Sequence, residues 1–427
     1  MAGLLPALFP PLFHFSFCRK RGSSCGEDPL LKADMRGASA LLMCVVAGAM
    51  VACSHPAVTG SSSWDRKAAA AYLDSRTGWW MDWRVSARDH GTVCVSCHTA
   101  LPYALARPAL RSALGEQGPS RNERRLIADV VKRVRLGKDA GPYYGDQGYD
   151  NKTAESRGTE AVLNALILAS YDAQKGQLSD DTRMAFANMW ALQQATGDER
   201  GAWQWLQFNL EPWEANDSVY YGATLAAMAV GTAPENYAAD AEVQDHLARL
   251  REYLKRENAT QSTINRVFLL RASTKLPGLL TTEQQQAIIH EVLSKQRRDG
   301  GWRLASVTWR WRSSNLWSSL GSLGKMWFRA DASPLDGKSD GVATSLITLA
   351  LEEAGVTRDN ARLQRGLSWL MSNQNTAEGF WPASSLNKRR SPSSDIGRFM
   401  SDAATAYAVL ALTESERTTN RVAMSNR

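Results

Sequence analysis

The sequence lacks several features that would assign it to a common class of protein. Its longest apolar run, residues 38–52, falls short of the roughly 20 residues that a membrane-spanning helix needs. It contains no nucleic-acid-binding motif, and its formal charge of +7 comes from basic residues scattered among acids. Beyond about residue 60 it shows no convincing alternation of apolar and polar residues, the pattern typical of strands. We therefore expect a helical protein with neither a nucleic-acid partner nor a nucleotide cofactor.

Cysteine is also scarce in the part of the chain that is expected to fold. Of the six cysteines, only Cys94 and Cys97 lie beyond residue 53; the others are Cys18, Cys25, Cys44 and Cys53. One close pair of cysteines in a chain that carries an export signal draws attention to the segment around that pair.

The N-terminus has the pattern of such a signal. Residues 35–53 begin with Met35 and an arginine, continue through the apolar run and end at Cys53, as in a signal peptide. The last four residues of this stretch resemble a bacterial lipoprotein cleavage box, so Cys53 is a candidate lipid anchor. Residues 1–34 read poorly as part of a fold. The sequence predicts an exported bacterial protein, periplasmic or held at a membrane surface through Cys53.

Residues 64–416 read as helices that alternate between two kinds. Six segments are small and apolar all round, which is typical of buried helices; they begin at Thr99, Thr159, Asp217, Thr263, Asp340 and Asp402. More amphipathic segments lie between them, around residues 66–74, 122–135, 180–194, 238–256, 282–296 and 361–374. A repeated hairpin of this kind cannot bury its faces alone. The sequence therefore predicts an all-α fold, an (α/α)6 toroid of six inner and six outer helices, with residues 417–427 as a tail.

In such a toroid the inner helices run parallel, and their N-termini open on one side of the ring, called the mouth below. Four inner helices carry an acid at or beside their start, namely Glu160, Asp217, Asp340 and Asp402. Capping and the helix dipole account for these acids without any catalytic role.

Three of the repeats share a local pattern in which a helix ends with Gln, a turn containing Gly follows, and a Trp packs back. The residues are Gln193, Gly201 and Trp203; Gln296, Gly301 and Trp302; and Gln374, Gly379 and Trp381. These segments resemble the Q-W repeats of the terpene cyclase family, to which squalene–hopene cyclases belong and whose toroid the protein prenyltransferases share. The resemblance implies a structural role, in which the motif ties an outer helix to the turn that follows it.

The resemblance does not extend to the acid that starts cyclisation. In that family a D-x-D-D motif at the mouth supplies a protonated Asp, which needs an unusual environment. Here Ala403 and Ala404 stand where two acids would follow Asp402, and the segment at Asp340 keeps only that acid. No D-D-x-x-D motif for diphosphate ionisation is visible. Terpenoid cyclisation or isomerisation by a lone Asp340 or Asp402 is therefore an alternative function.

Two connections on the mouth side are rich in Trp. One, over residues 201–218, carries Trp203, Trp205 and Trp213; the other, over residues 307–328, carries Trp309, Trp311, Trp317 and Trp327. Their rings can line a hydrophobic pocket, stabilise cations, dip into a membrane interface or pack over helix ends. An apolar isoprenoid or lipid-like ligand suits such a cavity. A basic run at residues 387–394 is a solvated loop or a contact for anions or lipid headgroups.

Residues 94–98, at the mouth of the first inner helix, place Cys94, Cys97 and His98 in a C-x-x-C-H spacing. Covalent haem c needs two thiols at this spacing and an adjacent His for the iron. The alternatives are a redox disulfide with Cys94 activated by the helix terminus, an irregular zinc site completed by His90, and chance. If the ring closes, Met400 approaches His98 and is a candidate second iron ligand; His90 or an open position is the alternative.

The sequence thus predicts an exported toroid with haem c at its mouth. It would exchange electrons with an apolar ligand or a redox partner, with His98 as iron ligand and Cys94 and Cys97 as attachment points. Terpenoid cyclisation is one alternative function, and a non-catalytic lipid-binding or scaffolding toroid held by a Cys94–Cys97 bond is another.

Overall fold

The computed structural model describes residues 63–146, 148, 150–309 and 324–425 of the 427-residue chain. The chain divides into two units, Met1–Thr59 and Gly60–Arg427, and every element below belongs to the second. The predicted signal peptide with Cys53 lies outside the described residues, as do Trp311 and Trp317. Within the described ranges we find no helix with both the length and the apolar character that a bilayer-spanning segment requires.

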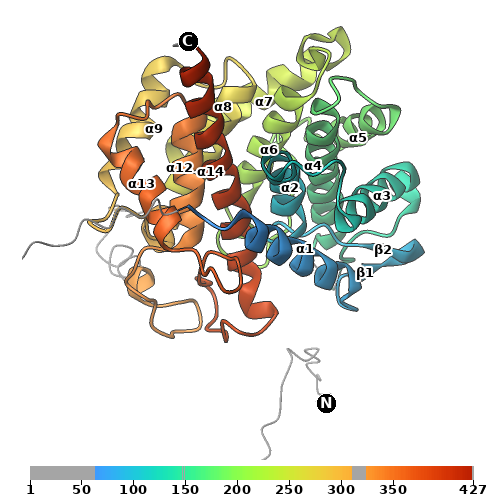
Figure 1. The fold of residues 1–427 in the computed structure, drawn as a ribbon. Coiled ribbons are helices and arrows are strands. Elements are labelled where there is room, and N and C mark those ends of the chain that lie inside the picture. The colour runs from blue at the N-terminus through green and yellow to red at the C-terminus, as the bar shows by residue number, and fades with distance from the viewer. Residues whose placement is uncertain (1–62, 147, 149, 310–323, 426–427) are drawn as a thin grey trace, which may run out of the picture. The chain divides into compact units, whose positions relative to one another are not determined.

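Long helices of Gly60–Arg427 alternate between an inner and an outer position (Figure 1). The inner helices are α2 (Ala100–Leu114), α4 (Lys152–Ala173), α6 (Ser218–Thr232), α8 (Thr263–Lys275), α12 (Gly341–Glu353) and α14 (Phe399–Ser425). The outer helices are α1 (Arg66–Asp82), α3 (Arg121–Leu136), α5 (Asp180–Ala191), α7 (Gln244–Glu257), α9 (Thr282–Ser294) and α13 (Ala361–Ser372). Each inner helix packs against the next, and α14 packs against α2. The predicted all-α toroid is confirmed.

Shorter elements lie in the connections. β1 (Ala87–Arg88) and β2 (Thr92–Val93) form an antiparallel hairpin that pairs Ala87 with Val93 and Arg88 with Thr92. A short helix, α10 (Leu304–Thr308), follows α9. Single 3-10 turns cover Asp89–Gly91, Gly137–Asp139, Tyr237–Ala239, Ala241–Val243, Asn258–Thr260 and Ile396–Arg398.

The composition of each helix explains its position in the ring. In α6, thirteen consecutive residues from Ser218 to Val230 are buried, as expected for a helix covered on all sides. In α13, burial is confined to Leu363, Gly366, Leu367, Trp369 and Leu370, the spacing of a single helix face. Small apolar residues all round therefore mark the inner ring, and one apolar stripe marks the outer ring.

The starts of the inner helices gather at one mouth. The hydroxyl of Thr99, beside the start of α2, donates to Asp402 in the first turn of α14 (2.7 Å). The side-chain amide of Asn265 in α8 donates to the carboxylate of Asp217 at the start of α6 (3.1 Å). Sequence reasoning placed two of these starts too late, because α4 begins at Lys152 rather than Thr159, and α14 at Phe399 rather than Asp402.

The Gln and Trp side chains of the three repeats make the same contacts in each copy. The indole N–H donates to a carbonyl near the end of the preceding outer helix, from Trp203 to Met189 (2.6 Å), from Trp302 to Val292 (2.7 Å) and from Trp381 to Leu370 (2.7 Å). The Gln amide donates to the carbonyl of a Gly in its own turn, from Gln193 to Gly201, from Gln296 to Gly300 and from Gln374 to Gly379.

Each Gln amide also donates to the backbone of the next outer helix or its cap. Gln193 reaches the carbonyl of His246 (2.9 Å), Gln296 that of Arg362 (2.7 Å) and Gln374 that of Asp65 (2.9 Å). Asp65 caps α1, so the last of these contacts joins the final repeat to the first helix. The motif therefore joins each of these outer helices to the turn that follows it and also to the next outer helix or its cap.

The glycine of the middle repeat is Gly300 and not Gly301, which sequence reasoning selected. Gly300 has φ +93°, matching Gly201 at +98° and Gly379 at +84°. A Cβ atom at Gly201 or Gly379 would lie 2.1 Å from a backbone oxygen of the next outer helix. The position therefore needs both a positive φ and the absence of a side chain.

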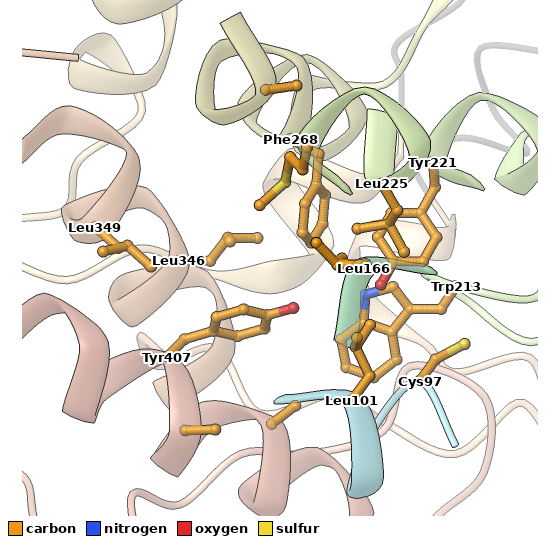
Figure 2. Packing of buried hydrophobic residues seen from close by; sticks show 14 of the residues in the cluster. Cys97, Leu101, Leu166, Trp213, Tyr221, Leu225, Phe268, Leu346, Leu349 and Tyr407 are labelled. Atoms are coloured by element: carbon orange, nitrogen blue, oxygen red, sulfur yellow. The ribbon is translucent and has the colours of Figure 1, made fainter. Parts of the chain in front are cut away.

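Aromatic side chains fill the interior of the ring among the described residues. Figure 2 shows side chains from all six inner helices converging on one cluster, with Cys97 and Trp213 at one side. The ring of Phe268 lies 4.7 Å from that of Tyr221 and 6.3 Å from that of Tyr407, and each of the three residues is at most 1% exposed. The centre is thus a packed core, and the candidate site has to be sought at the mouth.

Candidate functional site

A cavity of about 160 Å³ at the mouth brings three of the predicted site residues together. Cys97 and His98 reach it from the segment before α2, and Met400 reaches it from the first turn of α14. Phe399, the first residue of α14, also lines it, and other lining residues come from the α5–α6 and α13–α14 connections, among them Glu211, Trp213, Glu214, Asn387 and Arg390. We call this cavity the mouth pocket. The predicted approach of Met400 to His98 is therefore present as a shared pocket.

Backbone contacts hold the C-x-x-C-H segment in place. The amide of Cys94 donates to the carbonyl of Ser86 (2.8 Å), and the indole N–H of Trp80 donates to the carbonyl of Cys94 (2.7 Å). The hydroxyl oxygen of Ser96 then accepts from the amides of Thr99 (3.2 Å) and Ala100 (3.0 Å), which open α2. A serine between the two cysteines thus caps the first inner helix.

Hydrogen bonds fix the tautomer of His98. The Nδ1 of His98 lies 2.8 Å from the hydroxyl oxygen of Thr99, which itself lies 2.7 Å from a carboxylate oxygen of Asp402. A hydroxyl has one hydrogen, and the carboxylate can only accept it. The oxygen of Thr99 must therefore accept the Nδ1–H of His98, and Nε2 keeps its lone pair. This is the arrangement that metal-ligating histidines adopt, with the second nitrogen donating to a fixed acceptor.

The surroundings of His98 keep its imidazole neutral. Its ring stacks on Phe399 with centroids 3.9 Å apart, and its neighbour Trp80 packs edge-on at 5.1 Å. Burial, together with the positive charges of Arg76 and Arg390, lowers the pKa of His98 to about 3. A neutral imidazole with a free Nε2 is the form that binds metals.

Both thiols are free and buried. Cys94 is 7% exposed and Cys97 is 4% exposed. Burial raises the pKa of Cys94 to about 12 and holds that of Cys97 well above its ordinary value. Reactive thiols have lowered pKa values and partial exposure. The folded structure consequently gives little support to the alternative of an activated Cys94 in a redox disulfide.

Two glutamates of the mouth pocket were missed by sequence reasoning, which read their connection only for its tryptophans. Burial raises the pKa of Glu214 to about 7, and burial with the nearby charge of Asp217 raises that of Glu211 to about 7. In the described part of the chain, no group donates a hydrogen bond to the Glu214 carboxylate. The sequence does carry a signal for these glutamates, because two acids flank Trp213 in an apolar stretch.

Asp402 serves the structure of the mouth. It is 1% exposed, and its carboxylate accepts hydrogen bonds from Tyr72 (2.8 Å), Thr99 (2.7 Å) and twice from Arg76 (2.8 and 3.1 Å). Burial raises the pKa of Asp402, and these donors oppose that rise by stabilising the charged form. A carboxylate with four donors is poorly suited to giving a proton to an alkene.

Asp340 lies outside the mouth pocket. It caps α12 by accepting from the amide of Ala343 (3.0 Å), and it also accepts from the amide of Leu304. Burial raises the pKa of Asp340 to about 6. It lines a separate cavity of about 400 Å³ together with Arg303 and Phe380. Its contacts match the capping interpretation, and the fold does not bring it to His98.

His90 also lies outside the mouth pocket. It sits in the turn between β1 and β2 with its side chain 49% exposed, and its Nδ1 lies 2.9 Å from Asp89. Among the residues that the structure describes, no three His, Cys, Asp or Glu side chains are grouped so as to hold a metal ion. The zinc alternative therefore lacks its ligand set.

The chemical groups that line the mouth pocket suit a haem, but the volume of the pocket is small for one. The thiol of Cys97, a neutral imidazole and the thioether of Met400 line the pocket and are groups that hold haem c and its iron, whereas Cys94 is buried and is not among the lining residues. A cavity of about 160 Å³ is below the range of about 300–1,000 Å³ for ligand pockets, and a porphyrin needs more. The wall formed by Ser385, Arg390 and Ile396 belongs to a connection whose one helical turn is Ile396–Arg398. Binding a porphyrin requires this wall to move outward.

No protein-family model matches the chain, and no curated protein matches it. Among solved structures, it is similar to a wild-type glycosidase, with 13% identity and a TM-score of 0.43 over 81% of this chain and 98% of that chain. It is also similar to a glycosidase variant in complex with glucose, with 14% identity and a TM-score of 0.45 over the same shares. Values this low carry no argument about what this chain does.

Proposed function

We propose that the protein is an electron-transfer toroid whose mouth holds haem c, attached through Cys94 and Cys97 with His98 as iron ligand. The observation that supports this most is the hydrogen-bond chain from His98 through Thr99 to Asp402. It leaves Nε2 of a neutral imidazole without a hydrogen-bond partner among the described residues, in a pocket that Cys97 also lines. The partners of the protein would be a redox protein and an apolar isoprenoid or lipid-like ligand at the mouth.

When bound, haem c supplies one-electron transfer. The chain's own residues prepare for it. Thr99 orients His98, because the hydroxyl that accepts the Nδ1–H is held in turn by Asp402. Met400 enters the same pocket from α14, and a thioether ligand raises the potential of haem iron. Phe399 covers one face of the imidazole and keeps water from it.

The test is to produce the full chain in a host that matures c-type cytochromes. A haem absorption band that stays with the protein after denaturation is expected, and both Cys94→Ala and Cys97→Ala should weaken the attachment. His98→Ala should retain some attached porphyrin but change its absorption. Met400→Leu should remove the spectral features of sulfur-ligated iron, whereas Met189→Leu, at a buried methionine of α5, should not.

A colourless chain would overturn the proposal, provided that it is exported and has the helical content of the folded protein. If such a chain contained a Cys94–Cys97 disulfide, the result would instead support the non-catalytic toroid. If squalene were cyclised by the wild type but not by Asp340→Asn, cyclisation would replace electron transfer as the proposed function.

A further inference from the structure

Two consecutive aromatic side chains near the mouth are exposed. Trp327 is 58% exposed and Phe328 is 49% exposed, whereas Trp203, Trp302 and Trp381 are fully buried. Exposed large apolar side chains that lie together commonly mark an interaction surface. The question is what this pair contacts.

Backbone hydrogen bonds hold the pair in its exposed position. The amide of Leu335 donates to the carbonyl of Trp327 (2.7 Å), and Phe328 pairs with Pro334 across an isolated bridge. The following amides of Ala330 and Asp331 donate to the carbonyls of Leu386 (3.1 Å) and Asn387 (3.0 Å). The segment is thus fastened on two sides, and the exposure of its aromatic rings is a property of the fold.

Leu386 and Asn387, whose carbonyls accept these hydrogen bonds, are followed directly by a basic run. Lys388, Arg389 and Arg390 are all exposed, and the amide of Arg389 donates to the carboxylate of Asp331 (2.8 Å). Lys325, also exposed, precedes the aromatic pair. The fold therefore brings a cluster of cations at residues 388–390 close to the exposed aromatic pair at residues 327–328, although the two segments are distant in the sequence.

The nearby acids do not cancel this charge. The exposed acids of the segment are Asp331 and Asp336, against the exposed cations Lys325, Lys388, Arg389 and Arg390. The carboxylate of Asp331 is already engaged by Ser333 and by the amide of Arg389. The surface thus presents aromatic rings beside a net positive charge.

We propose that Trp327, Phe328 and the run Lys388–Arg390 form a docking surface for a bilayer that contains anionic lipids. Aromatic rings favour the boundary between headgroups and acyl chains, where one side of the ring is apolar and the other is wet. Clustered Lys and Arg side chains are attracted to anionic headgroups. The aromatic pair therefore suits the apolar side of that boundary, and the adjacent cations suit its anionic headgroups.

This surface borders the mouth pocket, because Arg390 also lines that pocket. Docking would turn the mouth toward the bilayer and bring an apolar ligand within reach of His98. The inference does not depend on haem, since it uses only residues of the rim and the lipid surface.

The experiment places an environment-sensitive fluorophore on the full chain through Phe328→Cys, with Cys18, Cys25, Cys44 and Cys53 replaced by Ser so that these thiols carry no label, and with Cys94 and Cys97 buried. The matched control is Met184→Cys, at a side chain of α5 that is 42% exposed. Each labelled protein is mixed with vesicles of phosphatidylcholine that contain one-third phosphatidylglycerol, or with phosphatidylcholine alone. This readout reports on the docking surface itself, so a lipid anchor elsewhere does not produce the signal.

We expect a blue shift at position 328 on anionic vesicles and none at position 184. Replacing Lys388, Arg389 and Arg390 together by Ser should raise the half-saturating lipid concentration roughly 100-fold. The proposal is overturned if the label at position 328 does not shift while the protein co-sediments with the vesicles. It is also overturned by equal shifts at the two positions, or by equal shifts on neutral and anionic vesicles.

Discussion

At the scale of single residues, Arg76 joins the first and the last helices of the ring. Its guanidinium donates to Asp402 in α14 (2.8 Å) and to Asp395 just before that helix (2.7 Å). The side chain of Arg76 is 5% exposed and that of Asp402 is 1% exposed. A buried ion pair is costly to break by removing one partner, because the other charge then has no counter-charge.

The first prediction concerns this pair. Arg76→Leu should lower the free energy of unfolding by about 3–5 kcal/mol, because it leaves the charge of Asp402 buried and unpaired. Urea denaturation measures the change. The control is Arg200→Leu, whose partner Glu252 is 56% exposed, and which should cost less than about 1 kcal/mol. Equal losses in the two variants would show that the buried pair has no special role.

Glu214 is a second residue with a measurable consequence. Burial raises the pKa of its carboxyl to about 7 in the folded protein, whereas the unfolded value is about 4.3. Between these two values the folded state holds a proton that the unfolded state has released. Stability therefore falls as the pH rises from about 4.3 to 7 and stays at the lower level above pH 7.

The second prediction follows from that sign. Glu214→Gln removes the loss, so its free energy of unfolding relative to the wild type should increase by about 3 kcal/mol between pH 4.5 and 7.5. Urea denaturation of the protein without haem, at a series of pH values, gives the comparison. Glu252→Gln, at an exposed side chain, should show a much smaller difference. A constant difference between Glu214→Gln and the wild type would contradict the assigned environment.

At the scale of elements, the Gln side chains act as ties between successive outer helices. Gln296 joins the turn after α9 to Arg362 at the start of α13, and Gln374 joins the turn after α13 to the cap of α1. The two contacts are alike in geometry but join different helices. The two glutamines are therefore a matched pair for mutation.

The third prediction uses this pair. Gln374→Ala and Gln296→Ala should each lower the free energy of unfolding by about 1–3 kcal/mol, the cost of leaving backbone carbonyls without donors. Hydrogen exchange should then separate them, with faster exchange at the start of α1 in Gln374→Ala and at the start of α13 in Gln296→Ala. Gln117→Ala, at an exposed side chain, is the control. Uniformly faster exchange in both variants would argue against local ties.

The same elements show which features of the fold can be predicted from the sequence alone. Small apolar residues around every side of α6 and α12 identify inner helices, since that pattern depends only on local neighbours. The contact of Arg76 with Asp402 spans 326 residues, so no local pattern indicates it. Glu214 was overlooked because its raised pKa comes from burial by distant segments. Met400 was placed near His98 from ring closure alone, whereas its bond to iron stays a prediction.

At the scale of the whole molecule, the ring closes through contacts between its two ends. The indole N–H of Trp64 donates to Glu416 (3.1 Å), the amide of Asp65 donates to Gln374 (2.7 Å), and α14 packs against α2. Closure also brings Phe399 and Met400 of α14 to the pocket that Cys97 lines. The surroundings of Cys97 thus depend on contacts between the two ends of the chain.

The fourth prediction tests that dependence. In the protein without haem, alkylation of Cys94 and Cys97 should be at least about 100-fold slower at pH 8 than in concentrated urea, because burial raises the pKa of Cys94 to about 12 and that of Cys97 well above its ordinary value, which leaves little thiolate. Mass spectrometry of samples taken over time measures both rates. Arg76→Leu should speed the reaction in water by loosening the contact between the ends of the chain. Similar rates with and without urea would mean that the thiols are open in the folded ring.

Ring closure also has a consequence for timing. Thr99 and its partner Asp402 are 303 residues apart, so at about 5–20 residues per second the ribosome needs roughly 15–60 s to make the intervening chain. During that interval Cys97 belongs to a chain that lacks α14, the helix that brings Phe399 and Met400 to its pocket. If haem is attached as proposed, the sulfur of Cys97 would be more open to the attaching enzyme before this helix docks, and delayed docking would lengthen that period.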